Sequence, residues 1–537
     1  PNWIVQYLVQ NSVGRLWLMA NPGSTLAQEW PYYIQPAEQT PEVQAQLDAL
    51  IQTRIAEDGD TLNPETITVL DPACGSGHIL VVAYDVLKAI YLERGYRLRD
   101  IPRLILEKNL YGLDIDDRAA QLAGFALLMK ARADDRRLLA DPENPPRLNI
   151  LSLQESQGLD AQALHAALMA GHSPQASRRT PDAGFADTDL FPATRPQMSL
   201  GEAAALPAPG ASSGLTQQAI AELIATFAHA KTFGSLIQIG PQRLPSLREQ
   251  LSILKSAEAS GDLYAQAAAK DLLPLVRQAL VLGMQFDAVV ANPPYMGGKG
   301  MNPALKEYAK DSFPDSKADL FAMFMERGFG WCKPSGFNSM VTMQSWMFLS
   351  SYEAMREKLL TQRTIQTMAH LGARAFGEIS GEVVQTTAFV LQGQHFLGFK
   401  PVFFRLVEGQ EAEKEAALRG NQNRFDATVQ DDFKKIPGSP VAYWVPEKLL
   451  DVYQTIPQLY EATISDGQNI TADNSRFVRF IWEIESEKVG RDRKWIYYAK
   501  GGSFRKWFGN NDIVVDWTED ARNFYRGNSS ARIIRSE

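Results

Sequence analysis

The stretch ITVLDPACGSG (residues 67–77) decides the fold of this 537-residue chain. Its first four residues form a short apolar run, which predicts a buried β-strand. The small residues that follow let backbone N–H groups approach a ligand closely, and a helix is predicted from about residue 79 to residue 94. The positive end of that helix points at the same place. A strand, a glycine turn and a helix in this order favour an open α/β sheet with a ligand at the strand end.

The same alternation of predicted strands and helices continues along the chain. LYGLD (residues 110–114) predicts a second strand, and a helix follows over about residues 118–132. Apolar runs at 286–291 and 337–342 predict further strands, and residues 365–371 and 383–391 are expected to complete the sheet as an antiparallel pair. We therefore predict an α/β fold with a doubly wound, Rossmann-like sheet.

Composition changes divide the chain into parts. Helical patterns fill most of residues 155–283, which predicts a helical insertion, interrupted by a Pro-, Ala-, Ser- and Gly-rich loop at 172–215. We expect a catalytic domain at 1–405, a connecting region at 406–464, and the truncated beginning of a recognition domain at 465–537. The chain starts at a proline without a methionine and stops within an aromatic and basic region, so we expect a piece of a longer protein.

Composition also limits the function. The chain is 45% apolar and 22% charged, and it carries a net charge of −8. Its two cysteines predict no disulfide framework and fit a reducing cytoplasm, and neither shows a metal-ligand spacing. No apolar run approaches the roughly 20 residues that span a bilayer. Residues 476–537 contain 13 Lys and Arg and 9 Asp and Glu, which gives this part of the chain a net charge of +4. Such a local positive charge is compatible with binding phosphates.

A second stretch, FDAVVANPPY (residues 286–295), carries the chemistry. The side-chain oxygen of Asn292 and the carbonyl of Pro293 offer two acceptors to one amino group. Pro293 and Pro294 have fixed φ and no N–H, so their carbonyls are aimed reproducibly. Tyr295 offers a flat face to a base, and such stacking contributes roughly 1–3 kcal/mol. The alternative is a surface Asn-Pro turn.

This arrangement suits an exocyclic amine such as that of adenine, whose nitrogen is a poor nucleophile because its lone pair is delocalised into the ring. Two acceptors on its two protons draw that lone pair back toward the nitrogen. A methyl group can then be transferred directly, without a cysteine or serine nucleophile. The sequence thus predicts a methyltransferase that uses S-adenosyl-L-methionine and acts on adenine in DNA, after the base is flipped out of the duplex.

The glycine loop is the expected cofactor site. Its candidate residues are Asp71, Pro72, Ala73, Cys74, Gly75 and Gly77, together with Asp114 and Ile115 after the second strand. A dinucleotide site is disfavoured, because Leu80 stands where a third glycine is needed and the next acid at a strand end, Asp114, lies 37 residues past Gly77. Asp114 is expected to bind the ribose hydroxyls, although it could instead cap a helix. Asp116 or Asp117 suits that capping role better.

Two roles stay open for Asp71, which can hold the cofactor's amino group or brace the loop. Cys74 is expected simply to be small.

These motifs resemble those of the gamma-class amino-methyltransferases, in which a cofactor loop precedes Asn-Pro-Pro-Tyr and a target recognition domain follows. DPACGSG (71–77) is similar to their motif I, YGLDID (111–116) to motif II, ANPPY (291–295) to motif IV and PNWIV (1–5) to motif X. AFG (375–377) is similar to motif VIII, and the resemblance implies that Phe376 packs on the flipped base. Phe376 could equally be a core residue.

A closer resemblance is to the PglX family, the adenine-specific methyltransferases of BREX phage-defence systems. It rests on NSVGRLW, DPACGSGHIL, NPPYMGG, DNSRFVRFIWEI and GGSFRKWFGN. The resemblance implies double-stranded DNA as substrate and other phage-defence subunits as partners. One departure concerns motif III, where the family has an acid: LNILSL (148–153) has none, and Asn149 or Ser152 could substitute.

Basic and aromatic residues alternate near the end of the chain. Those expected to bind DNA phosphates are Arg476, Arg479, Lys494, Arg505 and Lys506. The alternative is a solvated charged face.

Three other functions also fit parts of the sequence. A protein-glutamine methyltransferase also uses Asn-Pro-Pro-Tyr but is compact. The chain could also be the methyltransferase part of a fused restriction–modification enzyme. A non-catalytic DNA-recognition subunit of a defence complex would keep the fold without transferring a methyl group.

Overall fold

The structure of the chain is a computed structural model that describes residues 1–170, 215–376, 384–457, 471–499 and 501–528. They belong to two compact units, Pro1–Glu447 and Lys448–Glu537. The loop predicted at 172–215 lies outside the described residues, except for Leu215.

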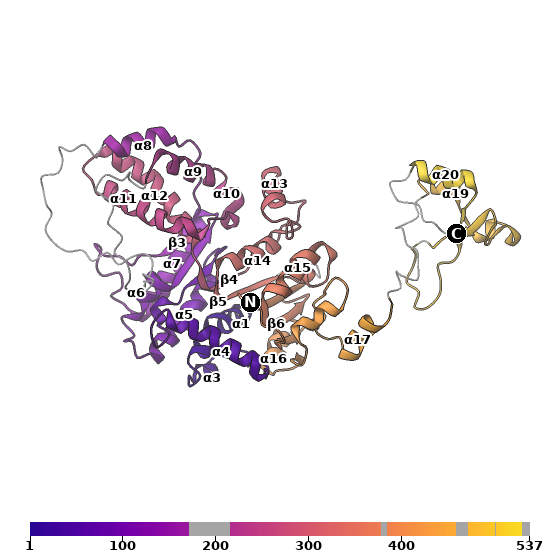
Figure 1. Cartoon of the computed structure of the whole chain (residues 1–537), viewed down its shortest axis with the longest axis horizontal. Coiled ribbons are helices and arrows are strands. Elements are labelled where there is room, and N and C mark those ends of the chain that lie inside the picture. Colours follow the sequence, from indigo (N-terminus) through magenta and orange to yellow (C-terminus); the bar gives the residue numbers. More distant parts are fainter. Residues whose placement is uncertain (171–214, 377–383, 458–470, 500, 529–537) are drawn as a thin grey trace, which may run out of the picture. The chain divides into compact units, whose positions relative to one another are not determined.

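The first unit is built on a nine-stranded sheet in the order β3-β2-β1-β4-β5-β7-β6-β8-β9 (Figure 1). Its strands are β1 (Val69–Asp71), β2 (Leu110–Asp114), β3 (Asn149–Ser152), β4 (Phe286–Ala291), β5 (Cys332–Met343), β6 (Thr364–Gly372), β7 (Thr386–Gln392), β8 (Val402–Arg405) and β9 (Arg424–Phe425).

The strand directions confirm the predicted doubly wound α/β sheet. β3, β2, β1, β4 and β5 run parallel, and β7 is antiparallel to both β5 and β6. The predicted antiparallel pair is therefore confirmed, but it does not complete the sheet, because β8 and β9 extend the sheet beyond β6. β5, β6 and β8 point the same way, because β6 pairs with β8 in parallel.

Both faces of the sheet are covered by apolar side chains. Leu70 and Val289 belong to one buried core, whereas Val69, Ala288 and Val290 belong to the other. This alternation follows from the two-residue period of a strand, and it explains why β4 is buried at every position. The first core includes α12 (Leu263–Gly283) and α14 (Leu320–Trp331), and the second includes α1 (Asn2–Val9) and α5 (His78–Glu93).

The predicted insertion is helical. Figure 1 shows its helices bundled beside β3; they are α8 (Ala161–Ala170), α9 (Gln217–Phe227), α11 (Leu244–Glu258) and α12. The sequence predicted helix throughout 244–282, and the structure breaks it at Ser260 and Gly261. Asp262 then caps α12 by accepting bonds from the backbone N–H groups of Tyr264 and Ala265. A short helix, α10 (Ala230–Phe233), leads from α9 back to the sheet.

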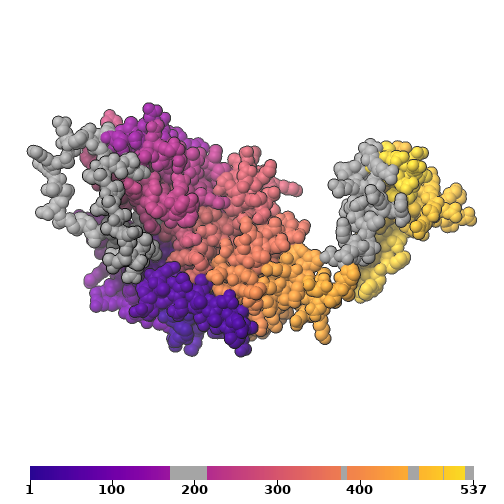
Figure 2. Space-filling model, in the orientation of Figure 1, coloured from indigo at the N-terminus to yellow at the C-terminus, as the bar shows by residue number. Residues whose placement is uncertain are grey.

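The N-terminal segment packs against a distant part of the chain. This segment is helical from Asn2 to Ala20, with a π-helical turn at Gln10–Gly14 between α1 and α2 (Arg15–Ala20). Next comes α4 (Pro41–Ala56), whose Val43 and Leu47 pack on Phe396 and Phe399. In Figure 2 the surface of this N-terminal segment, in indigo, touches the orange surface of the last part of the first unit.

The first unit runs past residue 405, where a connecting region was expected, to Glu447. β9 pairs with β8, and the buried Tyr443 ring stacks on Phe403 at 4.4 Å. In the second unit, β10 (Val478–Phe480), β12 (Ile513–Asp516) and β11 (Trp495–Tyr497) form a small antiparallel sheet.

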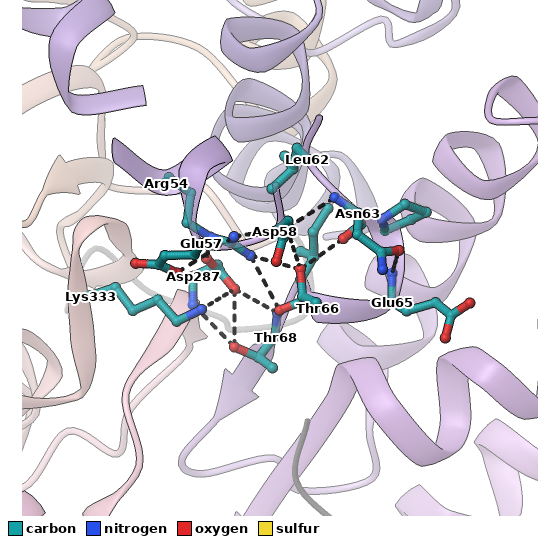
Figure 3. A network of polar contacts seen from close by, with 12 residues as sticks. Arg54, Glu57, Asp58, Leu62, Asn63, Glu65, Thr66, Thr68, Asp287 and Lys333 are labelled. Atoms are coloured by element: carbon teal, nitrogen blue, oxygen red, sulfur yellow. Dashed lines mark hydrogen bonds and ion pairs between the residues drawn. The ribbon is translucent and has the colours of Figure 1, made fainter. Parts of the chain in front are cut away.

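A buried ion pair joins the starts of the two strands that carry the motifs (Figure 3). Arg54 of α4 donates from Nε to Asp287 Oδ1 at 2.7 Å, and neither side chain is exposed. Asp287 Oδ2 accepts from the Thr68 backbone N–H at 2.9 Å and from Lys333 Nζ at 3.0 Å. Burial alone would raise the pKa of Asp287, but Lys333 and Arg54 outweigh it and hold that pKa at about 2.

Asp287→Asn is expected to lower the free energy of unfolding by about 3–5 kcal/mol, because it leaves the Arg54 guanidinium buried beside a neutral group. Urea unfolding followed by circular dichroism measures this loss. Since the folded pKa lies below the unfolded one, the wild-type contribution is complete above about pH 4 and disappears as the pH falls through about 2.

Glu57→Gln is the matched control. Glu57 also pairs with Arg54, at 3.6 Å, but its side chain is 42% exposed. The expected loss is therefore below about 1 kcal/mol. Equal losses in the two variants would contradict the assigned role of the buried pair.

Candidate functional site

Three motif-bearing loops meet at one edge of the sheet. β2, β1 and β4 are neighbouring parallel strands, with Asp71 beside Gly112 and Leu70 beside Val289 in the register. The loops that follow the three strands therefore emerge side by side. This is the edge at which open α/β sheets bind ligands.

The glycine loop turns sharply between β1 and α5. Gly75 and Gly77 have φ of 51° and 84°, a conformation that favours glycine. A side chain at Gly77 would also lie 2.9 Å from the Ala123 backbone. Cys74 is buried, and its sulfur packs where a side chain on Gly112 would stand, which agrees with the expectation that it is small. α5 starts at His78 and directs its positive end at the loop.

The structure shows Asp71 bracing the loop. Its Oδ1 accepts from the Ala73 backbone N–H at 3.1 Å, and the side chain is buried. Burial raises the pKa of Asp71 to about 8, and the nearby Asp114 adds to the rise. A carboxyl in this state can donate as well as accept a hydrogen bond at neutral pH.

Asp114 links two of the loops. Its Oδ2 accepts from the Gly75 backbone N–H at 2.8 Å, and its Oδ1 accepts from the Asp116 backbone N–H at 2.9 Å. Each carboxylate oxygen has a second lone pair that can accept from a ligand hydroxyl. Asp116 caps α7 (Asp117–Asp134) by accepting from the backbone N–H groups of Arg118 and Ala119. It is one of the two capping residues that the sequence favoured.

The insertion reaches into this site, which the sequence did not reveal. Ser235 is buried and donates from Oγ to the Pro72 carbonyl at 2.6 Å. Lys231 of α10 donates from Nζ to the Ile115 carbonyl at 2.7 Å and to Asp117 Oδ1 at 2.8 Å. A side chain on Gly234 would lie 3.0 Å from the Ile115 side chain.

The structure also places the two candidate substitutes for the missing motif III acid. β3 ends at Ser152, whose Oγ bonds Asp117 and receives Lys231 Nζ at 3.1 Å. Asn149 does not reach the site, because it is buried and donates to the carbonyls of Glu107 and Leu110. Of the two candidate substitutes, only Ser152 is therefore near the cofactor loop.

The Asn-Pro-Pro-Tyr loop follows β4. Asn292 is exposed, Pro293 is buried and Pro294 is exposed. The Tyr295 hydroxyl lies 3.3 Å from Asn292 Oδ1 and 3.2 Å from the Val341 carbonyl of β5. Burial raises the pKa of Tyr295, so its hydroxyl stays protonated at neutral pH.

Asp319 braces this loop from the start of α14. Its Oδ1 accepts from the backbone N–H of Met296 at 2.9 Å, and it caps the helix by accepting from the Phe321 N–H. The Phe321 ring meets Tyr295 edge-on at 6.1 Å. An acid before the apolar run LFAMF is a helix-start signal that could have pointed to Asp319.

The remaining candidates lie elsewhere. Phe376 is half-buried and packs against the second core, next to residues outside the described part of the chain. In the second unit, Arg476 covers the Phe477 and Phe524 rings, Arg479 donates to the carbonyls of Ser475 and Val478, and Lys494 pairs with Asp516 at 3.6 Å. Arg505 and Lys506 are exposed.

Among the described residues, no helix is both long and apolar enough to span a membrane.

Known proteins resemble this chain along nearly its whole length. Adenine-specific methyltransferase BrxX of Escherichia coli O9:H4 (strain HS) is 48% identical over 99% of this chain and 42% of that protein. Adenine-specific methyltransferase PglX of Lacticaseibacillus casei (strain Zhang) is 34% identical over 96% of this chain and 40% of that protein. The predicted resemblance to PglX is thus confirmed, and the chain spans about two fifths of these relatives.

Solved structures are more distant. A nuclease-deletion mutant of the Type ISP restriction-modification enzyme LlaGI in complex with a DNA substrate mimic has a TM-score of 0.36 and 13% identity, covering 74% of this chain and 26% of that one. The Type IIL restriction-modification enzyme MmeI in complex with DNA has a TM-score of 0.33 and 14% identity, over 75% and 40%.

Residues 108–376 match the model of one protein family, described as Eco57I restriction-modification methylase. This range begins just before β2 and includes the Asn-Pro-Pro-Tyr loop. The chain belongs to the Eco57I restriction-modification methylase family.

Proposed function

We propose that this chain is the methyltransferase part of a site-specific DNA methyltransferase that modifies N6 of adenine. The observation that carries the proposal is the position of Asn292-Pro293-Pro294-Tyr295 at the end of β4, directly beside the glycine loop at the end of β1. The names of the BrxX and PglX relatives support adenine as the target.

Each residue of the loop has a distinct task. The exposed Asn292 accepts one N6–H of a flipped adenine through Oδ1, and the Pro293 carbonyl accepts the other. Both bonds favour a lone pair localised on the nitrogen. The Tyr295 ring, fixed by Phe321 and by its own hydroxyl contacts, supplies the stacking face. Asp319 positions the loop without touching the base.

S-adenosyl-L-methionine supplies the methyl group when bound. The residues of the glycine loop fit it, because positive φ and small side chains leave space for a ligand against the backbone. Asp114 accepts from the ribose hydroxyls and Ile115 packs on the adenosyl ring. Asp71, with its raised pKa, braces the loop and faces the amino-acid end. Ser235 and Lys231 hold the loop from the insertion.

DNA is the proposed substrate, and the second unit is proposed as the beginning of its target recognition domain. The aromatic and basic residues of 476–507 support this role. We place the full-length protein in the cytoplasm, as a self-marking enzyme of a BREX-type phage-defence system with further subunits. The alternative is a non-catalytic DNA-recognition subunit, which would bind DNA without producing N6-methyladenine.

Asn292→Ala in the full-length protein is expected to reduce N6-methyladenine formation at least about 100-fold, because one of the two acceptors for the amino group is lost. Single-molecule sequencing of DNA from a host without its own adenine methylation measures this. S-adenosylmethionine affinity, measured by calorimetry, should change less than about threefold. Asn144→Ala, at an exposed asparagine away from the site, is the control. Undiminished methylation in Asn292→Ala would refute the catalytic assignment.

Ser235→Ala is expected to weaken S-adenosylmethionine binding roughly 3- to 10-fold, since it leaves the Pro72 carbonyl without its buried donor. The turnover rate at saturating cofactor should stay nearly constant, because Ser235 touches the loop and not the target base. Ser256→Ala removes an exposed serine of the same insertion and should bind the cofactor normally. A lowered turnover rate with normal cofactor affinity would count against this role.

The double substitution of Arg505 and Lys506 by alanine is expected to lower the slope of log binding constant against log salt concentration by about 1.8, since each lost phosphate contact removes about 0.9. Fluorescence anisotropy with duplex DNA at several salt concentrations gives the slope. Substituting Arg97 and Arg99, two exposed arginines of the first unit, removes the same charge and should leave the slope unchanged. An unaltered slope for the first pair would exclude both residues from the interface.

A further inference from the structure

A second aromatic pocket opens on the edge of the sheet that carries the Asn-Pro-Pro-Tyr loop. It has a volume of about 370 Å³, and its walls include Gln344 after β5, His370 near the end of β6, Arg405 at the end of β8, and the rings of Phe348 and Trp444. We call it the β6 pocket. Because β4, β5, β6 and β8 point the same way, these residues and Asn292 emerge from one edge.

Three flat side chains line the β6 pocket. Phe348 and Trp444 lie 5.6 Å apart at 61°, and His370 stacks on Trp444 at 6.1 Å and 30°. Phe348 is half-buried, and 37% of Trp444 is exposed. Aromatic surface that stays accessible in a concave site offers stacking faces to a planar ligand.

The polar groups of the β6 pocket form a fixed chain. His370 Nε2 lies 2.7 Å from Gln344 Oε1, His370 Nδ1 lies 3.1 Å from the Tyr443 hydroxyl, and Gln344 Nε2 donates to Gln385 Oε1 at 2.5 Å. Burial lowers the pKa of His370 to about 4, and Arg405 and Lys414 add to the effect. The imidazole is therefore neutral at pH 7, and the amide ends supply donors and acceptors to the edge of a ring.

Arg405 is the charge at the mouth of the pocket. Its guanidinium lies 5.9 Å from the centre of the Trp444 ring, and it forms no ion pair with a carboxylate in the part of the chain that the structure describes. Aromatic rings of this kind can also surround an organic cation, but Arg405 would repel one. Stacking faces, amide edges and an exposed arginine together suit a nucleotide.

We propose that the β6 pocket receives an unstacked nucleobase of the DNA substrate, with Arg405 binding the phosphate next to that base. β6 is three strands from β4 in the sheet, roughly 14 Å at about 4.8 Å per strand. That span corresponds to about four base steps of 3.4 Å. One DNA strand can thus present the target adenine to Asn292 and a second base to Trp444. The inference rests on the proposed function, because it assumes a DNA substrate.

The test uses the full-length protein and a single-stranded 12-nucleotide DNA that carries one 5-iododeoxyuridine. Irradiation followed by mass spectrometry is expected to locate cross-links in Phe348 or Trp444. In anisotropy titrations, Trp444→Ala should weaken binding of this DNA roughly 5- to 100-fold. Arg405 is exposed, so Arg405→Gln should not disturb the core. This variant should weaken DNA binding several-fold and lower the slope of log binding constant against log salt concentration by about 0.7.

Tyr264→Ala is the matched control, because Tyr264 is an aromatic residue of the insertion that is 77% exposed. Its binding should equal that of the wild type. Cross-links confined to other segments, or DNA binding unaffected by both Trp444→Ala and Arg405→Gln, would overturn the proposal. Failure of the proposed function looks different: N6-methyladenine would be absent while DNA binding still depended on Trp444.

Discussion

The pairing of Arg54 with Asp287 underlies the arrangement of the motif-bearing strands. Asp287 lies at the start of β4, and through the Thr68 backbone N–H it also fixes the start of β1. The cofactor loop and the Asn-Pro-Pro-Tyr loop grow from the opposite ends of the same two strands. A buried charge is costly unless it is paired and hydrogen-bonded, and here every oxygen of Asp287 has a partner. The register of β1 against β4 is thereby specified, and with it the relation between the two loops.

At the edge of the sheet where the motif-bearing loops emerge, most of the contacts that hold the loops in place are made to backbone carbonyls and N–H groups. Asp71, Asp114 and Asp319 each bind backbone N–H groups of the loops, and Ser235 and Lys231 bind loop carbonyls. Asp71 and Asp114 are also proposed to meet the cofactor, whereas Asp319, Ser235 and Lys231 are proposed only to hold the loops. The insertion thus contributes to the candidate cofactor site as well as to the core, because Lys231 of α10 and Ser235 of the 3-10 turn that follows it (Gly234–Leu236) supply two of these contacts.

The motif residues could be proposed from the sequence because the chemistry expected of them needs particular residue types at adjacent positions. Asn292 to Tyr295 and Asp71 to Gly77 each act as a contiguous stretch after a strand, so local sequence suffices to find them. Ser235 is different: it lies 163 residues from Pro72, and nothing in GSLIQIG distinguishes it from any buried serine. Trp444 and His370 likewise look like ordinary core residues until the fold brings them to one edge. Ser152 is one of two candidate substitutes for the motif III acid in the sequence, and its contacts with Asp117 and Lys231 appear only in the fold.

By itself the sequence determined the doubly wound sheet, the helical insertion and the two motifs, because hydrophobic period and turn chemistry are local properties. It also favoured Asp116 or Asp117 over Asp114 as the cap of α7, and the structure shows that Asp116 is the cap. Only the tertiary structure decided where the first compact unit ends, since Tyr443 packs on Phe403 through a stacking contact between distant segments. It alone decided which insertion residues brace the cofactor loop and which rings line the β6 pocket. Those outcomes depend on strand order and on side-chain packing across the sheet, and neither is written in any short stretch of the chain.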